Sequence, residues 1–133
     1  MDDRSTGRLG GLRVLVVEDV AVLARQVRDV LTEAGAEVIG LAPDVEDALA
    51  LLDKGEVDAA VLDMNLDGEP ADPVADALAS RGVPFLFLTG YGSGSVEGRH
   101  AERPSLGKPL RPTALVEVLA EITAGRGRPR GGA

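Results

Sequence analysis

Short apolar runs alternate with stretches of helical spacing along nearly the whole chain, and this alternation restricts the folds it can adopt. The runs lie at residues 12–17, 37–41, 59–62 and 83–88, with a weaker one at 105–107. Each run has the length of a buried β-strand. Between them, apolar residues recur every three or four positions, which predicts helices that each carry one apolar stripe. The predicted order is therefore βα repeated five times.

Near-continuous apolar strands joined by helices predict a parallel sheet covered on both faces, an α/β doubly wound fold with five strands. The length of 133 residues and the hydrophobic content of 44% suit a single domain. Gly35, Gly55 and Gly82 follow three of the helical stretches, where a left-handed cap is expected. Residues 1–10 and 125–133 lack periodicity, so we expect two disordered tails around a domain at 11–124.

The charge and composition exclude several classes of partner. A net charge of −8 disfavours binding to nucleic acid or to an anionic membrane, because both would be repelled. The chain has no cysteine, which favours a reducing compartment. The first apolar run ends at Glu18 and is too short for a signal peptide or a membrane span. We therefore expect a cytoplasmic protein.

Polar side chains follow the predicted strands at the points where those strands end. Glu18 and Asp19 follow the first strand, Asp63 ends the third, Thr89 ends the fourth, and Lys108 follows the fifth. The carboxyl ends of parallel strands meet at one edge of a sheet, so these side chains are expected to gather there. Neighbouring carboxylates need a cation to stay ionised, and an all-oxygen set favours Mg²⁺.

A lysine and a hydroxyl beside such a cation site are typical of phosphoryl chemistry. The cation and Lys108 would balance the charge on phosphoryl oxygens, and the Thr89 hydroxyl would donate a further hydrogen bond. One carboxylate must act as the acceptor. Asp63 is the best candidate, because it ends the most buried strand with the other groups arranged around it.

Four motifs in register, "VVED", "VLDMNL", "FLTG" and "GKP", resemble a response-regulator receiver domain, the phosphoacceptor half of two-component signalling. The resemblance covers roughly residues 12–124. It implies a flavodoxin-like (βα)5 fold and a sensor histidine kinase as phosphodonor to Asp63, with Thr89 as the switch hydroxyl and Lys108 as the phosphate-binding lysine. It also implies a Mg²⁺ site formed by Glu18, Asp19, Asp63 and the main-chain carbonyl of Asn65. The stretch from Phe87 to Tyr91 further resembles the stand-alone receivers called FATGUY proteins.

The sequence departs from the receiver pattern between the fourth and fifth strands. Most receivers carry Tyr or Phe three residues before the lysine, whereas this chain has Ser105, so the usual threonine–aromatic switch is not expected. Residues 90–104 hold four glycines and no clear apolar stripe, which predicts a short, mobile or partly unformed fourth helix with Tyr91 as a candidate packing element. His100, the only histidine, is expected to be exposed. The small Gly90 beside the acceptor predicts quick self-dephosphorylation.

The leading interpretation is a single-domain response regulator, a phosphoacceptor signalling protein without other catalytic activity. The chain ends soon after the fifth helix, so it is expected to signal through a downstream protein or to act as a phosphate sink, as a monomer or weak homodimer. One alternative is a haloacid-dehalogenase-like phosphatase, although that family has an acid two positions beyond the nucleophile, where this chain has Asn65. A receiver-like binding module that works without phosphate is the other alternative.

Overall fold

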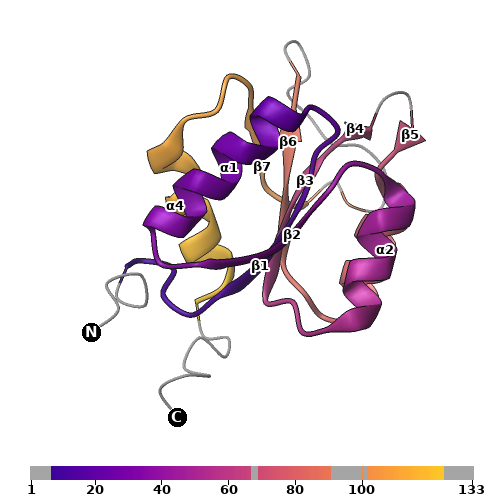
Figure 1. The fold of residues 1–133 in the computed structure, drawn as a ribbon, viewed down its shortest axis with the longest axis horizontal. Helices are drawn as coiled ribbons and strands as arrows, with labels where there is room; N and C mark the ends of the chain where they lie inside the picture. Colours follow the sequence, from indigo (N-terminus) through magenta and orange to yellow (C-terminus); the bar gives the residue numbers. More distant parts are fainter. Residues whose placement is uncertain (1–6, 67–68, 91–99, 101, 125–133) are drawn as a thin grey trace.

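The main sheet has five parallel strands in the order β2-β1-β3-β6-β7 (Figure 1). The computed structural model describes residues 7–66, 69–90, 100 and 102–124. The predicted five-stranded parallel sheet is confirmed. Its strands are β1 (Arg13–Val17), β2 (Glu37–Ala42), β3 (Ala59–Asp63), β6 (Phe85–Thr89) and β7 (Ser105–Gly107).

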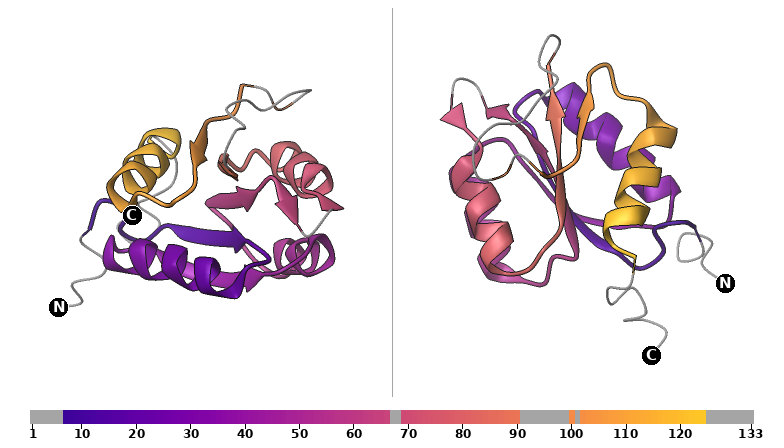
Figure 2. Two further views of the ribbon diagram at one scale, coloured as in Figure 1. Left: turned by 90° about the horizontal axis from the view of Figure 1, so that it is seen from above. Right: turned by 180° about the vertical axis from the view of Figure 1, so that it is seen from behind.

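Helices cover both faces of the sheet, which confirms the doubly wound arrangement (Figure 2). Those within the described ranges are α1 (Ala21–Glu33), α2 (Val45–Lys54), α3 (Asp72–Ser80) and α4 (Pro112–Ile122). The pair α1 and α4 lies on one face, and α2 and α3 lie on the other. No helix in this part of the chain is both long enough and apolar enough to cross a bilayer.

The two faces of each strand feed two separate parts of the core, as the alternation of side chains along a strand requires. In β1, Leu15 and Val17 pack toward α2 and α3, whereas Val14 and Val16 pack toward α1 and α4. Every residue of β3 and β6 is buried. These central strands can therefore hold a side chain at their carboxyl ends with little freedom of movement.

The ends of the elements differ in part from the prediction. Gly35 and Gly82 adopt positive φ angles of 99° and 71°, as expected for left-handed caps. Gly55 has a φ of −166°, an extended conformation, so the prediction of a left-handed cap there is wrong. Leu9 is fully buried and its N–H donates to the Ala34 carbonyl at 2.8 Å, so the packed chain begins before residue 11.

Two predicted features lie mainly or wholly outside the described residues. The expected short fourth helix and Tyr91 belong to 90–104, of which the structure describes residues 90, 100 and 102–104. The two expected tails lie mostly in 1–6 and 125–133, which the structure does not describe. The expectations for these residues, and the proposed limit of the domain at residue 124, stay predictions.

A short antiparallel hairpin that the sequence did not predict follows directly after β3. It consists of β4 (Asn65–Leu66) and β5 (Glu69–Pro70). Leu66 is only 2% exposed and packs in the core beside α2 and α3. The hairpin is therefore fixed to the body of the domain at the carboxyl edge of the sheet.

Candidate functional site

Three carboxylates meet at the carboxyl edge of the sheet, where the strand order reverses between β1 and β3. Glu18 and Asp19 directly follow β1, and Asp63 is the last residue of β3. One oxygen from each of the three lies within 4.8 Å of the others. This edge is where ligands bind in open α/β sheets, and the structure brings the predicted carboxylates together there.

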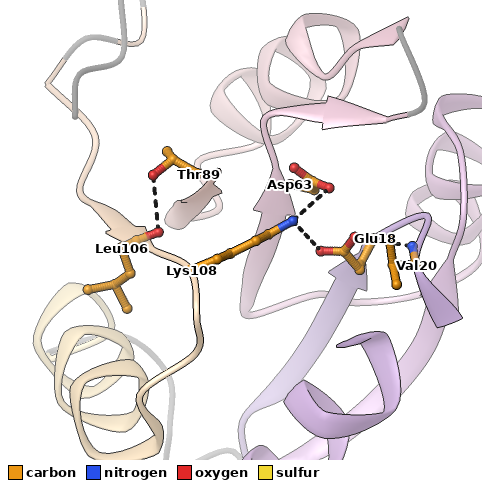
Figure 3. Close-up of polar contacts among 6 residues, drawn as sticks. All are labelled: Glu18, Val20, Asp63, Thr89, Leu106 and Lys108. Atoms are coloured by element: carbon orange, nitrogen blue, oxygen red, sulfur yellow. Dashed lines mark hydrogen bonds and ion pairs between the residues drawn. The ribbon is translucent and has the colours of Figure 1, made fainter. Parts of the chain in front are cut away.

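Lys108 joins this acidic cluster from the end of β7. Its Nζ lies 3.2 Å from Asp63 Oδ2 and 3.4 Å from Glu18 Oε1 (Figure 3). Its backbone N–H donates to the Thr89 carbonyl at 2.9 Å, which ties the start of the lysine's loop to β6. One ammonium therefore contacts two acids that come from two other strands.

The Glu18 carboxyl is the most buried member of the cluster, at 2% exposure for the residue. Its Oε2 accepts a hydrogen bond from the Val20 N–H at 3.1 Å (Figure 3). Its Oε1 makes no hydrogen bond to the described residues and has only the ion pair with Lys108. Burial, helped by the hydrogen bond and the charge of Asp63, raises the pKa of Glu18 to about 7, although Val20 and Lys108 oppose this.

The charge of Lys108 responds to the same neighbours. Partial burial lowers the pKa of its ammonium, but the carboxylates of Asp63 and Glu18 outweigh this effect, so the pKa lies above its ordinary value. Ionising the buried Glu18 is unfavourable, and Lys108 supplies only one positive charge to a cluster of three carboxylates. A further positive charge would therefore stabilise the cluster. The orphaned Oε1 atom and the all-oxygen donor set fit a hard divalent cation.

The Thr89 side chain is close to the cluster but is not directed at it. Thr89 is buried, and its hydroxyl donates to the Leu106 carbonyl at 3.5 Å, on the side away from Asp63 (Figure 3). The predicted hydrogen bond from this hydroxyl to a phosphoryl group would require the side chain to turn. Its role as a switch stays a prediction.

The backbone of Asn65 is oriented by the β4–β5 hairpin. Asn65 pairs with Pro70, and the neighbouring Ala71 N–H donates to the Met64 carbonyl at 3.3 Å. In an antiparallel ladder this bond makes Asn65 and Pro70 a pair without mutual hydrogen bonds, so their backbone groups point out of the hairpin. The Asn65 carbonyl is thus directed away from β5, and its role as a cation ligand stays a prediction.

His100 was expected to be exposed, and this prediction is wrong. The residue is 8% exposed, and its Nε2 lies 2.8 Å from Asp76 Oδ1 in α3. Its ring packs against that of Phe85 in a T-shaped arrangement, with 5.7 Å between centroids. The partner carboxylate is 24 residues away in the sequence and belongs to another element, so no local pattern could have revealed this contact.

The fold and the site together define a class of protein: a doubly wound α/β domain with an acidic pocket and a lysine at its switch point. Residues 14–120 match the family model described as the response regulator receiver domain. The chain belongs to this family. Its bacterial relatives are response regulators of two-component systems, and the family is a signalling family.

Two curated relatives illustrate how the match is distributed. The transcriptional regulatory protein TcrA of Mycobacterium tuberculosis is 39% identical over 92 residues, which cover 68% of this chain and 36% of TcrA. The two-component response regulator PhoP of Pseudomonas aeruginosa is 36% identical over 117 residues, or 85% of this chain and 51% of PhoP. The chain thus spans about half or less of these relatives.

Solved structures give matches over nearly their full length. The solution structure of SdrG from Sphingomonas melonis Fr1 has a TM-score of 0.75 and 38% identity, covering 84% of this chain and 95% of SdrG. The receiver domain of PhyR from Erythrobacter litoralis has a TM-score of 0.79 at 21% identity, covering 91% of this chain and 96% of that domain, and shows likeness of fold. Membership of the FATGUY subgroup stays a prediction.

Proposed function

We propose that Asp63 accepts a phosphoryl group from a phosphohistidine of a sensor histidine kinase, and that the modified domain signals through another protein or drains phosphate from the kinase. The observation that carries this proposal is the contact of Lys108 with both Asp63 and Glu18 at the switch point. A single lysine held against two acids at a sheet edge is a site for balancing charge on an incoming dianion.

Mg²⁺ would be held by Glu18, Asp19, Asp63 and the Asn65 carbonyl, and when bound it would neutralise charge on the phosphoryl oxygens. The chain's own residues do the rest. Asp63 supplies the attacking oxygen from a strand that is buried throughout, which fixes its position. Lys108 exchanges part of its contact with Asp63 for the phosphoryl oxygens. Thr89 gains a hydrogen-bond acceptor there if its hydroxyl leaves Leu106.

The exposure of Gly90 supports the earlier expectation of a short phosphoryl lifetime. Gly90 is exposed, and a Cβ added there would meet no atom of the described residues within 4 Å. A site without a side chain at this position offers water a path to the phosphorylated aspartate. We also propose that this protein is cytoplasmic and is a monomer or a weak homodimer. We propose that it binds neither nucleic acid nor a membrane.

The test is to incubate the protein with Mg²⁺ and a small phosphodonor and to follow mass and base-labile phosphate. We expect one phosphoryl group per chain, complete loss of labelling in Asp63→Ala, and unchanged labelling in Asp29→Ala, which removes an exposed aspartate of α1. The adduct should accumulate while the donor is present and disappear quickly once the donor is removed. Turnover of the donor without an adduct that accumulates would instead indicate a phosphatase, and a wild-type protein that neither accumulates an adduct nor turns over the donor would indicate a phosphate-independent binding module.

A further inference from the structure

The strand that delivers Lys108 contributes only one side chain, Leu106, to the apolar core. β7 has three residues, lies at the edge of the sheet and pairs only with β6 among the described strands. Ser105 and Gly107 lie opposite Phe87 and Thr89, and neither has a large side chain. A Cβ added at Gly107 would meet no atom within 4 Å. Apart from Leu106, which packs against the apolar core, side-chain packing within β7 therefore does little to fix the strand.

Side chains from α3, from β6 and from the chain just ahead of β7 are in mutual contact. We call this group the His100 anchor, and it consists of Asp76, Phe85, His100 and Arg103. The His100 ring packs against the Phe85 ring in a T-shaped arrangement, and its Nε2 lies 2.8 Å from Asp76 Oδ1. The Arg103 guanidinium lies 4.5 Å from the centre of the Phe85 ring, over its face. The Arg103 N–H also donates to the His100 carbonyl at 3.0 Å. The anchor ties the chain ahead of β7 to α3 and β6.

Backbone hydrogen bonds continue from the anchor to the lysine. The Phe87 N–H donates to the Pro104 carbonyl at 3.0 Å, directly after Arg103 in the chain. At the other end of β7 the Lys108 N–H donates to the Thr89 carbonyl at 2.9 Å. The anchor and Lys108 are thus the two ends of one short stretch that runs along β6.

We propose that His100 is a positioning residue: fastened to Asp76 and Phe85, it sets where β7 lies and thereby holds the Lys108 ammonium at Asp63 and Glu18. The proposal takes the role of Lys108 from the proposed function above. The Lys108 Nζ lies 3.4 Å from Glu18 Oε1 and 3.2 Å from Asp63 Oδ2. Displacements of about 1 Å are enough to slow chemistry that depends on orientation. His100 never touches the reacting atoms.

The two lysines of the chain allow a direct test of this proposal. Lysine-selective ¹³C labelling gives side-chain signals for Lys108 and Lys54 alone, and the exposed Lys54 serves as internal reference. In His100→Ala we expect the Lys108 signal to move toward that of Lys54. We also expect Asp63 phosphorylation by a small phosphodonor to slow by roughly tenfold, because the lysine is misplaced but still present.

Partner variants show whether the pair acts as a unit. Asp76→Ala should reproduce both effects, whereas Asp76→Asn keeps a hydrogen-bonding oxygen for His100 and should be much milder. The double variant His100→Ala with Asp76→Ala should be no worse than either single variant, as expected for residues that act through one contact. Fully additive effects would contradict the proposal.

Arg81→Ala is the matched control. It removes another contact between elements, the hydrogen bonds of Arg81 to the Leu52 carbonyl at 2.8 Å and to Asp53 at 2.7 Å, and should leave the Lys108 signal unchanged. An unchanged Lys108 signal in a folded His100→Ala protein would overturn the proposal. If His100→Ala does not fold, Asp76→Ala carries the same test. A wild-type protein that is not phosphorylated would refute the proposed function, while the lysine signals would still decide the role of the anchor.

Discussion

Glu18 performs three tasks with one carboxyl group. Oε2 accepts the Val20 N–H at the start of α1, Oε1 faces Lys108, and the group belongs to the cluster that fits a cation. Glu18 is 2% exposed, so ionisation of its carboxyl group destabilises the folded state when no cation is bound. The sequence indicated that this acid lies at the edge of the sheet but not that it is buried, because burial depends on which residues surround it.

This cost should make stability depend on pH when divalent cations are removed. Below the ordinary pKa of 4.5 Glu18 is protonated in both the folded and unfolded states, and above the folded pKa of about 7 it is ionised in both. The free energy of unfolding should therefore fall as pH rises from 4.5 through 7, by at most roughly 3 kcal/mol.

Denaturant unfolding of wild type and Glu18→Gln in chelator, at several pH values, measures this difference. The Gln variant should gain stability relative to wild type as pH rises, because it carries no charge to bury. Glu33→Gln, at an exposed site on α1, is the control and should track the wild type. A stability difference between Glu18→Gln and wild type that stays constant with pH would contradict the prediction.

The helices differ in how they begin. Asp44 caps α2 with its side chain, accepting the Asp47 N–H at 2.8 Å, whereas Val20, Ala71 and Arg111 precede α1, α3 and α4 without a side-chain cap. Val20 instead has its own N–H bonded by Glu18. The start of α2 is thus stabilised by its own N-cap side chain, whereas the start of α1 is stabilised by Glu18, a residue of the candidate site.

Asp44→Ala should lower the free energy of unfolding by about 1 kcal/mol, because it removes the acceptor for an otherwise unpaired N–H at the helix start. Asp44→Ser and Asp44→Asn should retain most of the stability, since both side chains can cap a helix. Chemical denaturation at constant pH measures the three variants. Equal losses in all three would indicate that charge near the helix start, and not the hydrogen bond, is what matters.

The elements were predictable to the extent that their signals were periodic or local. Five strands and the helices on both faces followed from apolar spacing, and the convergence of Asp63 and Lys108 followed from parallel topology. The β4–β5 hairpin has strands of two residues, too short to show alternation. The direction of the Thr89 hydroxyl and the burial of His100 depend on Leu106 and Asp76, contacts between distant segments that carry no sequence periodicity.

For the whole molecule, a cation that binds only the folded state must stabilise it. Mg²⁺ at about a hundredfold over its dissociation constant should add roughly 2.7 kcal/mol to the free energy of unfolding. The gain should be larger at pH 8 than at pH 5.5, because protonation of Glu18 competes with the cation, given its pKa of about 7. Thermal unfolding with Mg²⁺ or with chelator measures the effect.

Variants of the acidic cluster separate this effect from general salt screening. Asp19→Asn should lose most of the Mg²⁺-dependent gain, because it removes one member of the cluster. Asp29→Asn, on the exposed side of α1, should keep it. An equal gain in both variants, or an equal gain from a monovalent salt at the same ionic strength, would show that the acidic cluster does not hold the ion.

The bond from the Val20 N–H to Glu18 has a consequence that reaches beyond the pocket. The Val20 amide at the start of α1 donates to the Glu18 carboxyl group, which also contacts whatever occupies the cluster. A proton, a lysine or a divalent ion at this carboxyl group therefore changes the polarity that the amide experiences. Occupancy of the pocket therefore changes the surroundings of the backbone amide at the start of α1, on the side of the domain opposite β7. A binding partner resting on α1 could distinguish the loaded state from the empty one without touching the phosphorylated residue.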